Sequence, residues 1–239
     1  MVYNNMIKSY RHELKYICTD QQICLIKHRL LSLLQYDLHA GSNGEYIISS
    51  LYFDDCYNTC YHENANGEDP RCKFRIRIYN HSEEHISLEK KIKINGMTRK
   101  EICLIDGDIF EKMIAGDDCR AYLGRNNLLD QWILDRKVRM LRPRCIIEYK
   151  RIPLIYKLGN VRITFDSQIC ANNDISTFFK HDTSGINVLP MGIQVLEVKY
   201  DSFLPDIIYD LCNIGHLYQC TFSKFFLCCN AMEGNEYVI

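Results

Sequence analysis

The segment KFRIRIYN, residues 73–80, decides how the fold is interpreted. Its charged residues Lys73, Arg75 and Arg77 alternate strictly with apolar ones. A period of two is typical of a β-strand with two different faces. The usual interpretation puts the apolar face in a core and the charged face in water, so the question is whether the charged face is really the outer one.

The same alternation recurs in five other segments. Charged or polar side chains share one face in RHELKY, SLEKKIKI, MTRKEI, VRITFD and QVLEVKY, which begin at residues 11, 87, 97, 161 and 194. For a single strand, a solvated sheet face is the simpler interpretation. Six such strands, flanked by helices with apolar faces, indicate instead that helices cover the outside of a closed sheet and that the charged faces line its interior.

The composition describes an ordinary globular protein and excludes several classes. The 239 residues are 47% hydrophobic and 25% charged, with a net charge of −1. No stretch is long and uncharged enough for a transmembrane helix, and residues 1–16 lack the apolar segment of a signal peptide. A near-neutral charge argues against a general nucleic-acid coat. We therefore expect one cytoplasmic domain over residues 1–239 with no nucleic-acid partner.

The thirteen cysteines are expected to be reduced and mostly buried. Their number is odd, and no C-x-x-C motif occurs. Cys56 and Cys60 lie four residues apart, but no second pair completes a zinc site. This pattern fits a reducing compartment better than a disulfide framework.

The chain reads as eight strands interspersed with helices. Strands are predicted at residues 11–18, 45–55, 72–80, 85–94, 97–105, 144–156, 160–170 and 193–201. Helices are predicted at residues 19–35, 106–116, 126–141, 205–215 and 221–232. Thr19 and Gln22 form a capping-box pattern, and Asn95-Gly96 predicts a type I′ hairpin turn. Without repeats or linkers, these elements indicate one α+β domain.

A closed sheet with an interior of arginine and lysine poses an energetic problem. An eight-stranded barrel has room for side chains or a small ligand, but each unpaired buried ion costs several kcal/mol. The few carboxylates on these strands cannot balance so many cations, whereas a polyanion inside the barrel could. Arginine suits such a ligand, because its planar group binds phosphate oxygens bidentately. Arg75 and Arg77 are therefore expected to face a phosphate-binding cavity.

In order along the chain, RHELKY, SLYFDD, KFRIRIYN, SLEKKIKINGMTRK, VRITFD, VLEVKY and FSKF resemble the VTC domain of polyphosphate polymerases, over roughly residues 7–230. This family belongs to the triphosphate tunnel metalloenzymes, together with the CYTH phosphatases. The resemblance implies an α+β fold, an eight-stranded antiparallel tunnel β-barrel with a charged lumen surrounded by helices. It also implies a divalent metal, ATP as phosphoryl donor and polyphosphate as acceptor and product. Members of the family can be attached to membrane channels. Because no transmembrane helix is expected in this sequence, any membrane role would need a separate partner.

Carried over motif by motif, the resemblance assigns three kinds of site residue. Phosphate or nucleotide binding falls to Lys15, Arg75, Arg77, Lys91, Lys100, Arg151, Arg162, Lys199 and Ser223. Catalytic roles fall to Arg75, Arg77, Lys199 and Lys224. The metal ligand is Glu197, whose oxygen atoms suit Mn²⁺ or Mg²⁺. Such a site needs no P-loop, and the sequence contains none.

The sequence departs from the family pattern at its start. The CYTH branch typically opens with E-x-E-x-K, whereas Arg11 makes this motif R-x-E-x-K. The change weakens a metal site there and favours the VTC branch. Glu13 and Glu89 stay open as auxiliary metal ligands or as salt-bridge partners of the lysines.

Other positions allow two interpretations. In CIIEYKRIPL, either Glu148 and Lys150 or Tyr149 and Arg151 face the lumen, and the family pattern favours the second pair. Trp132 is expected in the core. The pair His81 and His85 is interpreted as surface or polar packing residues rather than metal ligands. A second set could line the lumen without a chemical role: Ser50, Tyr52 and Asp54. A basic cluster is interpreted as a solvated helix end, with a path for the product as the alternative: Arg136, Lys137, Arg139, Arg142 and Arg144.

The leading hypothesis from the sequence is a metal-dependent polyphosphate polymerase that uses ATP. One alternative is a triphosphate or tripolyphosphate hydrolase on the same tunnel. A second alternative is a non-catalytic module that binds polyphosphate or inositol polyphosphates.

Overall fold

The structure is a computed structural model that describes residues 6–7, 9–180, 185–215 and 217–234, so part of the N-terminal stretch discussed above lies outside it. Its long strands are β2 (His12–Thr19), β4 (Tyr46–Asp54), β5 (Arg71–Tyr79), β6 (Ile86–Ile94), β7 (Met97–Ile105), β8 (Arg142–Tyr156), β9 (Val161–Asn172) and β11 (Ile193–Tyr200). They form one antiparallel sheet in the order β7-β6-β5-β4-β8-β9-β11-β2. The eight predicted strands are thus confirmed.

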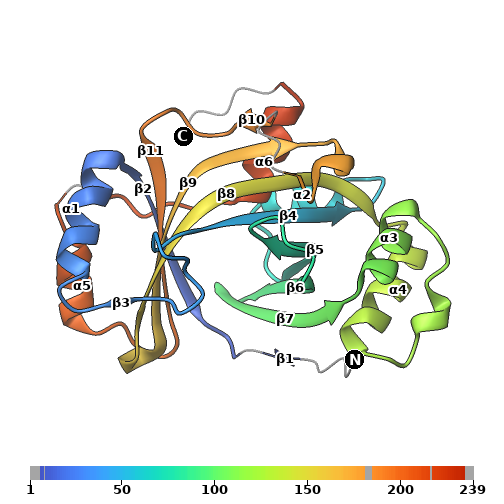
Figure 1. Cartoon of the computed structure of the whole chain (residues 1–239), viewed down its shortest axis with the longest axis horizontal. Helices are drawn as coiled ribbons and strands as arrows, with labels where there is room; N and C mark the ends of the chain where they lie inside the picture. Colours follow the sequence, from blue (N-terminus) through green and yellow to red (C-terminus); the bar gives the residue numbers. More distant parts are fainter. Residues whose placement is uncertain (1–5, 8, 181–184, 216, 235–239) are drawn as a thin grey trace.

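The sheet curls strongly (Figure 1), with β7 and β2 as the long strands at its two ends. Three two-residue strands extend it: β1 (Met6–Ile7) beside β7, β3 (Gln35–Tyr36) beside β8, and β10 (Ile186–Asn187) beside β9. Beyond β1, Arg11 and Thr98 exchange backbone hydrogen bonds of 2.9 and 3.0 Å, which join the start of β2 to β7. Each long strand therefore has one face toward the enclosed side of the sheet and one toward the outside.

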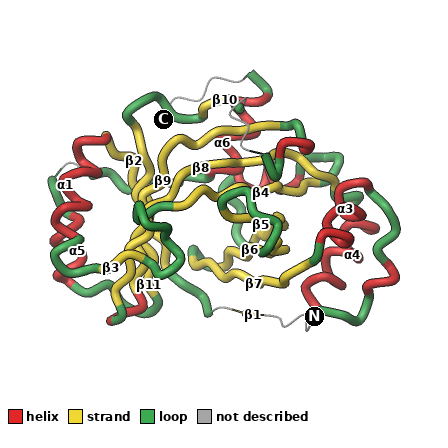
Figure 2. Tube along the Cα trace, viewed as in Figure 1, coloured by secondary structure: helices red, strands yellow, loops and turns green. Residues whose placement is uncertain are grey.

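Six α-helices surround the sheet within the described ranges. They are α1 (Asp20–Leu30), α2 (Thr59–Ala65), α3 (Gly107–Ala115), α4 (Asn127–Arg139), α5 (Asp206–Cys212) and α6 (Lys224–Met232), with single 3₁₀ turns η1 (Arg120–Tyr122), η2 (Leu158–Asn160) and η3 (Ile175–Thr177). Figure 2 shows α1 and α5 together at one end of the molecule and α3 and α4 at the other. The helix α2 was not predicted from the sequence.

The first helix begins as predicted and ends early. Thr19 and Gln22 exchange both hydrogen bonds of a capping box, at 2.8 and 3.3 Å. The helix was expected to run to residue 35 but ends at Leu30. A turn follows the helix and leads into β3, where Gln35 and Tyr36 pair with Ile155 and Leu154 of β8. Similarly, α6 starts at Lys224 with Ser223 as its N-cap, not at residue 221.

The predicted hairpin has the geometry that its sequence requires. Asn95 and Gly96 both have positive φ angles, 51° and 75°, as a type I′ turn demands. The carboxylate of Asp69 accepts hydrogen bonds from both turn amides, at 2.9 and 2.8 Å. The turn fixes the register in which Lys91 of β6 lies opposite Lys100 of β7.

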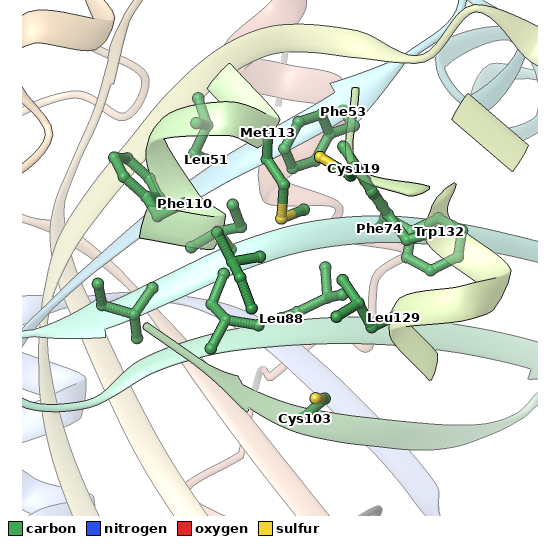
Figure 3. Packing of buried hydrophobic residues seen from close by; sticks show 14 of the residues in the cluster. Leu51, Phe53, Phe74, Leu88, Cys103, Phe110, Met113, Cys119, Leu129 and Trp132 are labelled. Carbon is green, nitrogen blue, oxygen red and sulfur yellow. The ribbon is translucent and has the colours of Figure 1, made fainter. Parts of the chain in front are cut away.

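The apolar faces of the strands point outward to helices. Phe74 and Ile76 of β5 belong to a buried cluster with α3 and α4, which also contains the predicted core residue Trp132 (Figure 3). Burial of apolar surface contributes roughly 25 cal/mol per Å², so this contact stabilises the sheet against the helices. With the apolar residues committed to the outside, the charged residues of the same strands must face inward.

The last helix, α6, packs at one end of the sheet. Gln168 is an extra, left-handed residue in β9 that shifts the register against β8. Beyond it, Ile169 and Ala171 cluster with Ile147 of β8 and with α6. These apolar side chains need a cover, so α6 packs at one end of the sheet and brings its first residue, Lys224, to the interior.

Two composition-based expectations can be compared with the structure. All thirteen cysteines are free thiols. No helix in the described part of the chain is long and apolar enough to cross a membrane.

Candidate active site: a cationic tunnel

Three adjoining cavities lie inside the curled sheet. The central cavity, of about 80 Å³, is lined by side chains of β2, β4, β5, β6, β8 and β11 and by residues 222–225. A wider cavity of about 450 Å³, called here the α2-side cavity, shares Lys15, Lys73 and Lys91 with it. A far cavity of about 100 Å³ shares Arg77 and Arg151 with it. Because neighbouring cavities share walls, they form one passage, called the tunnel below.

The R-x-R strand β5 lies at the centre of this tunnel. The guanidinium of Arg75 donates to Glu89 at 2.6 and 2.7 Å and to the hydroxyl of Tyr52 at 2.6 Å. Arg77 donates to the hydroxyl of Ser50 at 3.1 Å. Both arginines are buried. These contacts fix the guanidinium planes, so a bound phosphate would meet positioned donors rather than mobile ones.

Glu89 acts as a salt-bridge partner. Its carboxylate also accepts from Lys100 at 2.8 Å and lies 3.9 Å from Arg77. Burial alone would raise the pKa of Glu89, but Arg75 and Lys100 hold it well below the usual range. Burial lowers the pKa of Lys100 to about 7 against the opposing effect of Glu89. Of the two roles left open for Glu89, this geometry favours the salt bridge.

A second network joins β2, β6 and β11. Lys91 binds Glu13 at 2.8 Å, Lys199 binds Glu197 at 2.9 Å, and Lys15 lies 3.7 Å from Glu197. Burial opposes ionisation of Glu197, yet Lys199 and Lys15 keep its pKa well below normal. The pKa of Glu13 is lowered as well, chiefly by Lys91 against burial. Both acids are therefore carboxylates at neutral pH.

The third network resolves the register left open in β8. Arg151 forms a bidentate pair with Asp166 at 2.6 and 2.7 Å, and Tyr149 accepts a hydrogen bond from Arg77 at 3.2 Å. Tyr149 and Arg151 thus face the tunnel, as predicted. Asp166 also binds Lys224 at 2.6 Å. Burial lowers the pKa of Lys224, but Asp166 and Tyr149 raise it above its usual value, so this lysine is cationic.

The start of α6 is held by capping and by α2. The Ser223 hydroxyl accepts from the backbone amide of Phe226 at 3.3 Å and from the Asn64 side chain at 2.9 Å. Ser223 lines the central and α2-side cavities. The cap therefore fixes Lys224, the first residue of α6, against the central cavity.

Arg162 and Lys100 lie in the far cavity. Arg162 donates to Tyr46 at 2.8 Å and pairs with Asp37 at 2.9 Å. Arg11 lines the same cavity but pairs with Asp201 at 2.8 Å. An arginine held in this way does not contribute to a metal site, which agrees with the effect expected of the R-x-E-x-K motif.

The tunnel has a large excess of positive charge. Among the described residues, twelve lysines and arginines line the central and far cavities, whereas Glu13 and Glu197 are the carboxylate residues that do. Glu89 and Asp166 add two buried carboxylates behind this wall. Each carboxylate is shared among several cations, so the deficit of negative charge remains. A site of this kind selects a strongly anionic ligand.

The predicted residues converge here, and several functional ones were missed. All eleven predicted site residues line the central or the far cavity. No role was predicted for Lys73, Asp166 or Asn64, although strand alternation placed the first two on charged faces. Arg136 and Lys137 line a separate cavity of about 480 Å³ beside α4, as a helix-end cluster outside the tunnel would.

The remaining expectations are also located. Tyr52 and Ser50 line or contact the tunnel as predicted, whereas the carboxylate of Asp54 turns away to accept backbone amides of Cys60 and Tyr61 at the start of α2, at 2.9 and 3.0 Å. His81 is buried 3.5 Å from Glu148, outside the tunnel, which fits a packing role.

A curled antiparallel sheet that encloses a cationic passage defines a tunnel domain. The sequence profile of the VTC domain matches residues 10–233, so the chain belongs to the VTC domain family. No curated protein matches the sequence. Among solved structures, a putative adenylyl cyclase from Hippeastrum, HpAC1, described as having a dominant triphosphatase activity, aligns with a TM-score of 0.51 and 12% identity over 96% of this chain and 98% of that one.

Two further solved structures align less well. A putative adenylate cyclase from Bacillus halodurans has a TM-score of 0.47 and 11% identity over 84% of this chain and 86% of its own. The protein PH1819 from Pyrococcus horikoshii has a TM-score of 0.43 and 13% identity over 85% and 84%.

The family implies a divalent metal, and the donors in the tunnel fit one. Glu197 and Glu13 supply ionised oxygen ligands, the kind that Mg²⁺ and Mn²⁺ prefer. Within the described residues, no group of three or more His, Cys, Asp or Glu side chains gathers into a metal site. The protein would thus hold the ion by one or two carboxylates, with phosphate oxygens completing its shell.

Proposed function

We propose that the chain is a metal-dependent polyphosphate polymerase that transfers the γ-phosphoryl group of ATP to a polyphosphate chain inside the tunnel. The observation that supports this most is that twelve cationic residues face two carboxylate residues in the central and far cavities, and that the passage continues into the α2-side cavity. A linear polyanion can neutralise such a wall and extend along it. A compact anion would fill only the central cavity.

Each group has a role that its contacts support. Arg75 and Arg77 hold the phosphates with planar donors, and Lys15, Lys91, Lys100, Arg151, Arg162 and Lys199 continue the cationic wall. Ser223 and Lys224 present the end of α6 to the centre. In the transfer, the bond from the γ-phosphorus to its bridging oxygen breaks, and a terminal oxygen of the acceptor chain bonds to that phosphorus. ADP leaves with the electron pair of the broken bond.

Positioned cations meet the main chemical demand of this reaction, which is the stabilisation of charge on the phosphoryl oxygens. Lys224, kept cationic by Asp166, and Lys199 beside Glu197 would supply that stabilisation. A divalent ion on Glu197 would neutralise further phosphate charge and orient the triphosphate. No protein nucleophile is required.

A triphosphate hydrolase on the same tunnel is the second candidate. The likeness in fold to HpAC1, described as having a dominant triphosphatase activity, supports it. Arg11 favours the polymerase. It occupies the first acidic position of the E-x-E-x-K motif of the hydrolases, and it pairs with Asp201. A receptor for polyphosphate or inositol polyphosphates would use the same wall without turnover. The free thiols support a reducing, cytoplasmic setting for each of these functions.

The test is incubation of the purified protein with ATP and Mn²⁺, followed by electrophoresis of the products. A polymerase makes long-chain polyphosphate, and Glu197→Gln and Lys224→Met abolish it, whereas Lys157→Met, which removes an exposed charge outside the tunnel, does not. Orthophosphate without polymer would identify a hydrolase. Binding of tripolyphosphate without turnover or metal requirement would identify a receptor.

A further inference from the structure

Lys73 is a tunnel residue to which the chemistry described above gives no role. It lies on the same face of β5 as Arg75 and Arg77, and directly opposite Lys91 of β6. It lines both the central and the α2-side cavities. Its position is therefore the neck between the two.

The surroundings of Lys73 are cationic or apolar. Its ammonium lies 5.0 Å from the ring centre of Phe225 and 5.7 Å from that of Tyr52. In the described part of the chain, it forms no ion pair and no hydrogen bond, whereas Lys91 binds Glu13 and Lys15 binds the carbonyl of Phe222 at 2.8 Å. The titratable groups around it are Lys91 of β6, Lys15 of β2, Arg75 of β5, Tyr52 of β4 and Cys60 of α2.

This placement is unfavourable for the free protein. Burial, followed by repulsion from Lys91 and Lys15, lowers the pKa of Lys73 to about 7. A methionine at this position would suit the rings of Phe225 and Tyr52 and would remove the repulsion. Folding therefore does not account for a lysine here. A ligand that supplies the missing negative charge does.

We propose that Lys73 binds a phosphate unit at the neck of the tunnel, beyond the units held by Arg75 and Arg77, and that it directs a linear phosphate chain into the α2-side cavity. The inference rests on the proposed function, in that the tunnel must accept phosphate chains. Residues two apart on one strand face are about 6.8 Å apart, so the three cations form a row. The α2-side cavity is the widest of the three, with room for a chain that continues past this row.

The inference predicts dependence on chain length. Isothermal titration calorimetry at pH 7 compares inorganic tripolyphosphate with long-chain polyphosphate for wild type, Lys73→Met and Lys73→Arg. Lys73→Met should weaken binding of the long chain by about tenfold, the effect of one charge-assisted hydrogen bond, and bind tripolyphosphate within about twofold of wild type. Lys73→Arg should keep the preference for the long chain, and Lys157→Met should leave both affinities unchanged.

A thermal melt without ligand separates binding from folding. Lys73→Met should melt at or above the temperature of wild type, because it removes a repelled buried charge. A lower melting temperature with equal losses for both ligands would mean a structural lysine and would overturn the inference. An unchanged long-chain affinity in Lys73→Met would overturn it as well. If wild type binds neither ligand, the proposed function itself fails, an outcome distinct from a lost length preference in a protein that binds tripolyphosphate.

Discussion

Substitution of Asp166 by asparagine tests how strongly the tunnel depends on its few carboxylates. Asp166 is completely buried, and its two oxygens accept from Arg151 at 2.6 and 2.7 Å and from Lys224 at 2.6 Å. Asparagine has nearly the same shape, so Asp166→Asn leaves no cavity. It removes one charge and leaves two buried cations with less compensation.

The expected loss of stability follows from these contacts. Removing one partner of a buried ion pair costs about 3–5 kcal/mol, because the remaining charge stays buried without its counter-ion. After the substitution, Arg151 retains Glu197 at 3.5 Å, and Lys224 forms no other ion pair in the part of the chain described. At about 2–4 °C per kcal/mol for a chain of this size, the melting temperature should fall by roughly 6–20 °C.

Urea and thermal unfolding at pH 7 measure this loss. The control is Asp118→Asn, which removes an exposed acid paired with Arg120 and should leave stability unchanged. In a double variant, Lys224→Met should restore part of the stability lost in Asp166→Asn, because it removes one of the stranded cations. Tripolyphosphate should also narrow the gap between the single variant and wild type.

The pH dependence gives a second check on Asp166. Burial raises its pKa, but Arg151 and Lys224 together lower it below 3.8. A carboxyl group whose pKa is lower in the folded than in the unfolded state stabilises the protein at pH values above its unfolded-state pKa. It loses this contribution as the pH falls through its folded-state pKa.

Two results would refute the view that these charges are tightly coupled: a loss of unfolding free energy below about 1 kcal/mol in Asp166→Asn at pH 7, or no recovery of stability when Lys224→Met is added.

Three further predictions concern separate features of the fold. Thr19→Ala should lower the unfolding free energy by about 1 kcal/mol in urea titrations, because it removes the capping box with Gln22; no loss would show that this cap contributes nothing. Gly96→Ala should destabilise by about 1 kcal/mol through its φ of 75° alone, because no atom lies within 4 Å of the added methyl group, and equal melting temperatures would contradict this. The pKa of Lys73 is about 7 in the folded protein and 10.5 in the unfolded one, so the unfolded state binds more protons between these pH values. The unfolding free energy should therefore rise from pH 7 to pH 8 more steeply in wild type than in Lys73→Met. Parallel profiles would contradict a buried, repelled ammonium group.

Much of the fold could be predicted because the strands repeat one local rule. Alternation in KFRIRIYN separates Phe74 and Ile76, which pack on the outer helices, from Arg75 and Arg77, which face the tunnel. The rule needs no long-range information, since side-chain direction alternates along any strand. The hairpin at Asn95-Gly96 was predictable for a similar reason, because its turn type is fixed by two adjacent residues.

The features that sequence reasoning missed depend on contacts between distant segments. Helix α2 begins at a left-handed Asn58 without a side-chain cap, so it has no local start signal. Its N-terminus is instead fixed by Asp54, which the sequence placed only in a strand. The inward position of α6 depends on the extra residue Gln168 in β9, and one such residue exchanges the faces of everything beyond it.

The roles within the tunnel were the least predictable part, since a charged face does not reveal which charges compensate one another. Asp166 and Lys73 both lie on faces with arginine neighbours. Asp166 is bound by two cations, whereas Lys73 has cations, aromatic rings and the Cys60 thiol around it. In a buried environment, that difference decides between a group that stabilises the free protein and one that a bound anion must compensate. The tunnel therefore combines enough carboxylates to fold with too few to be neutral, and the remaining deficit is what a phosphate chain can fill.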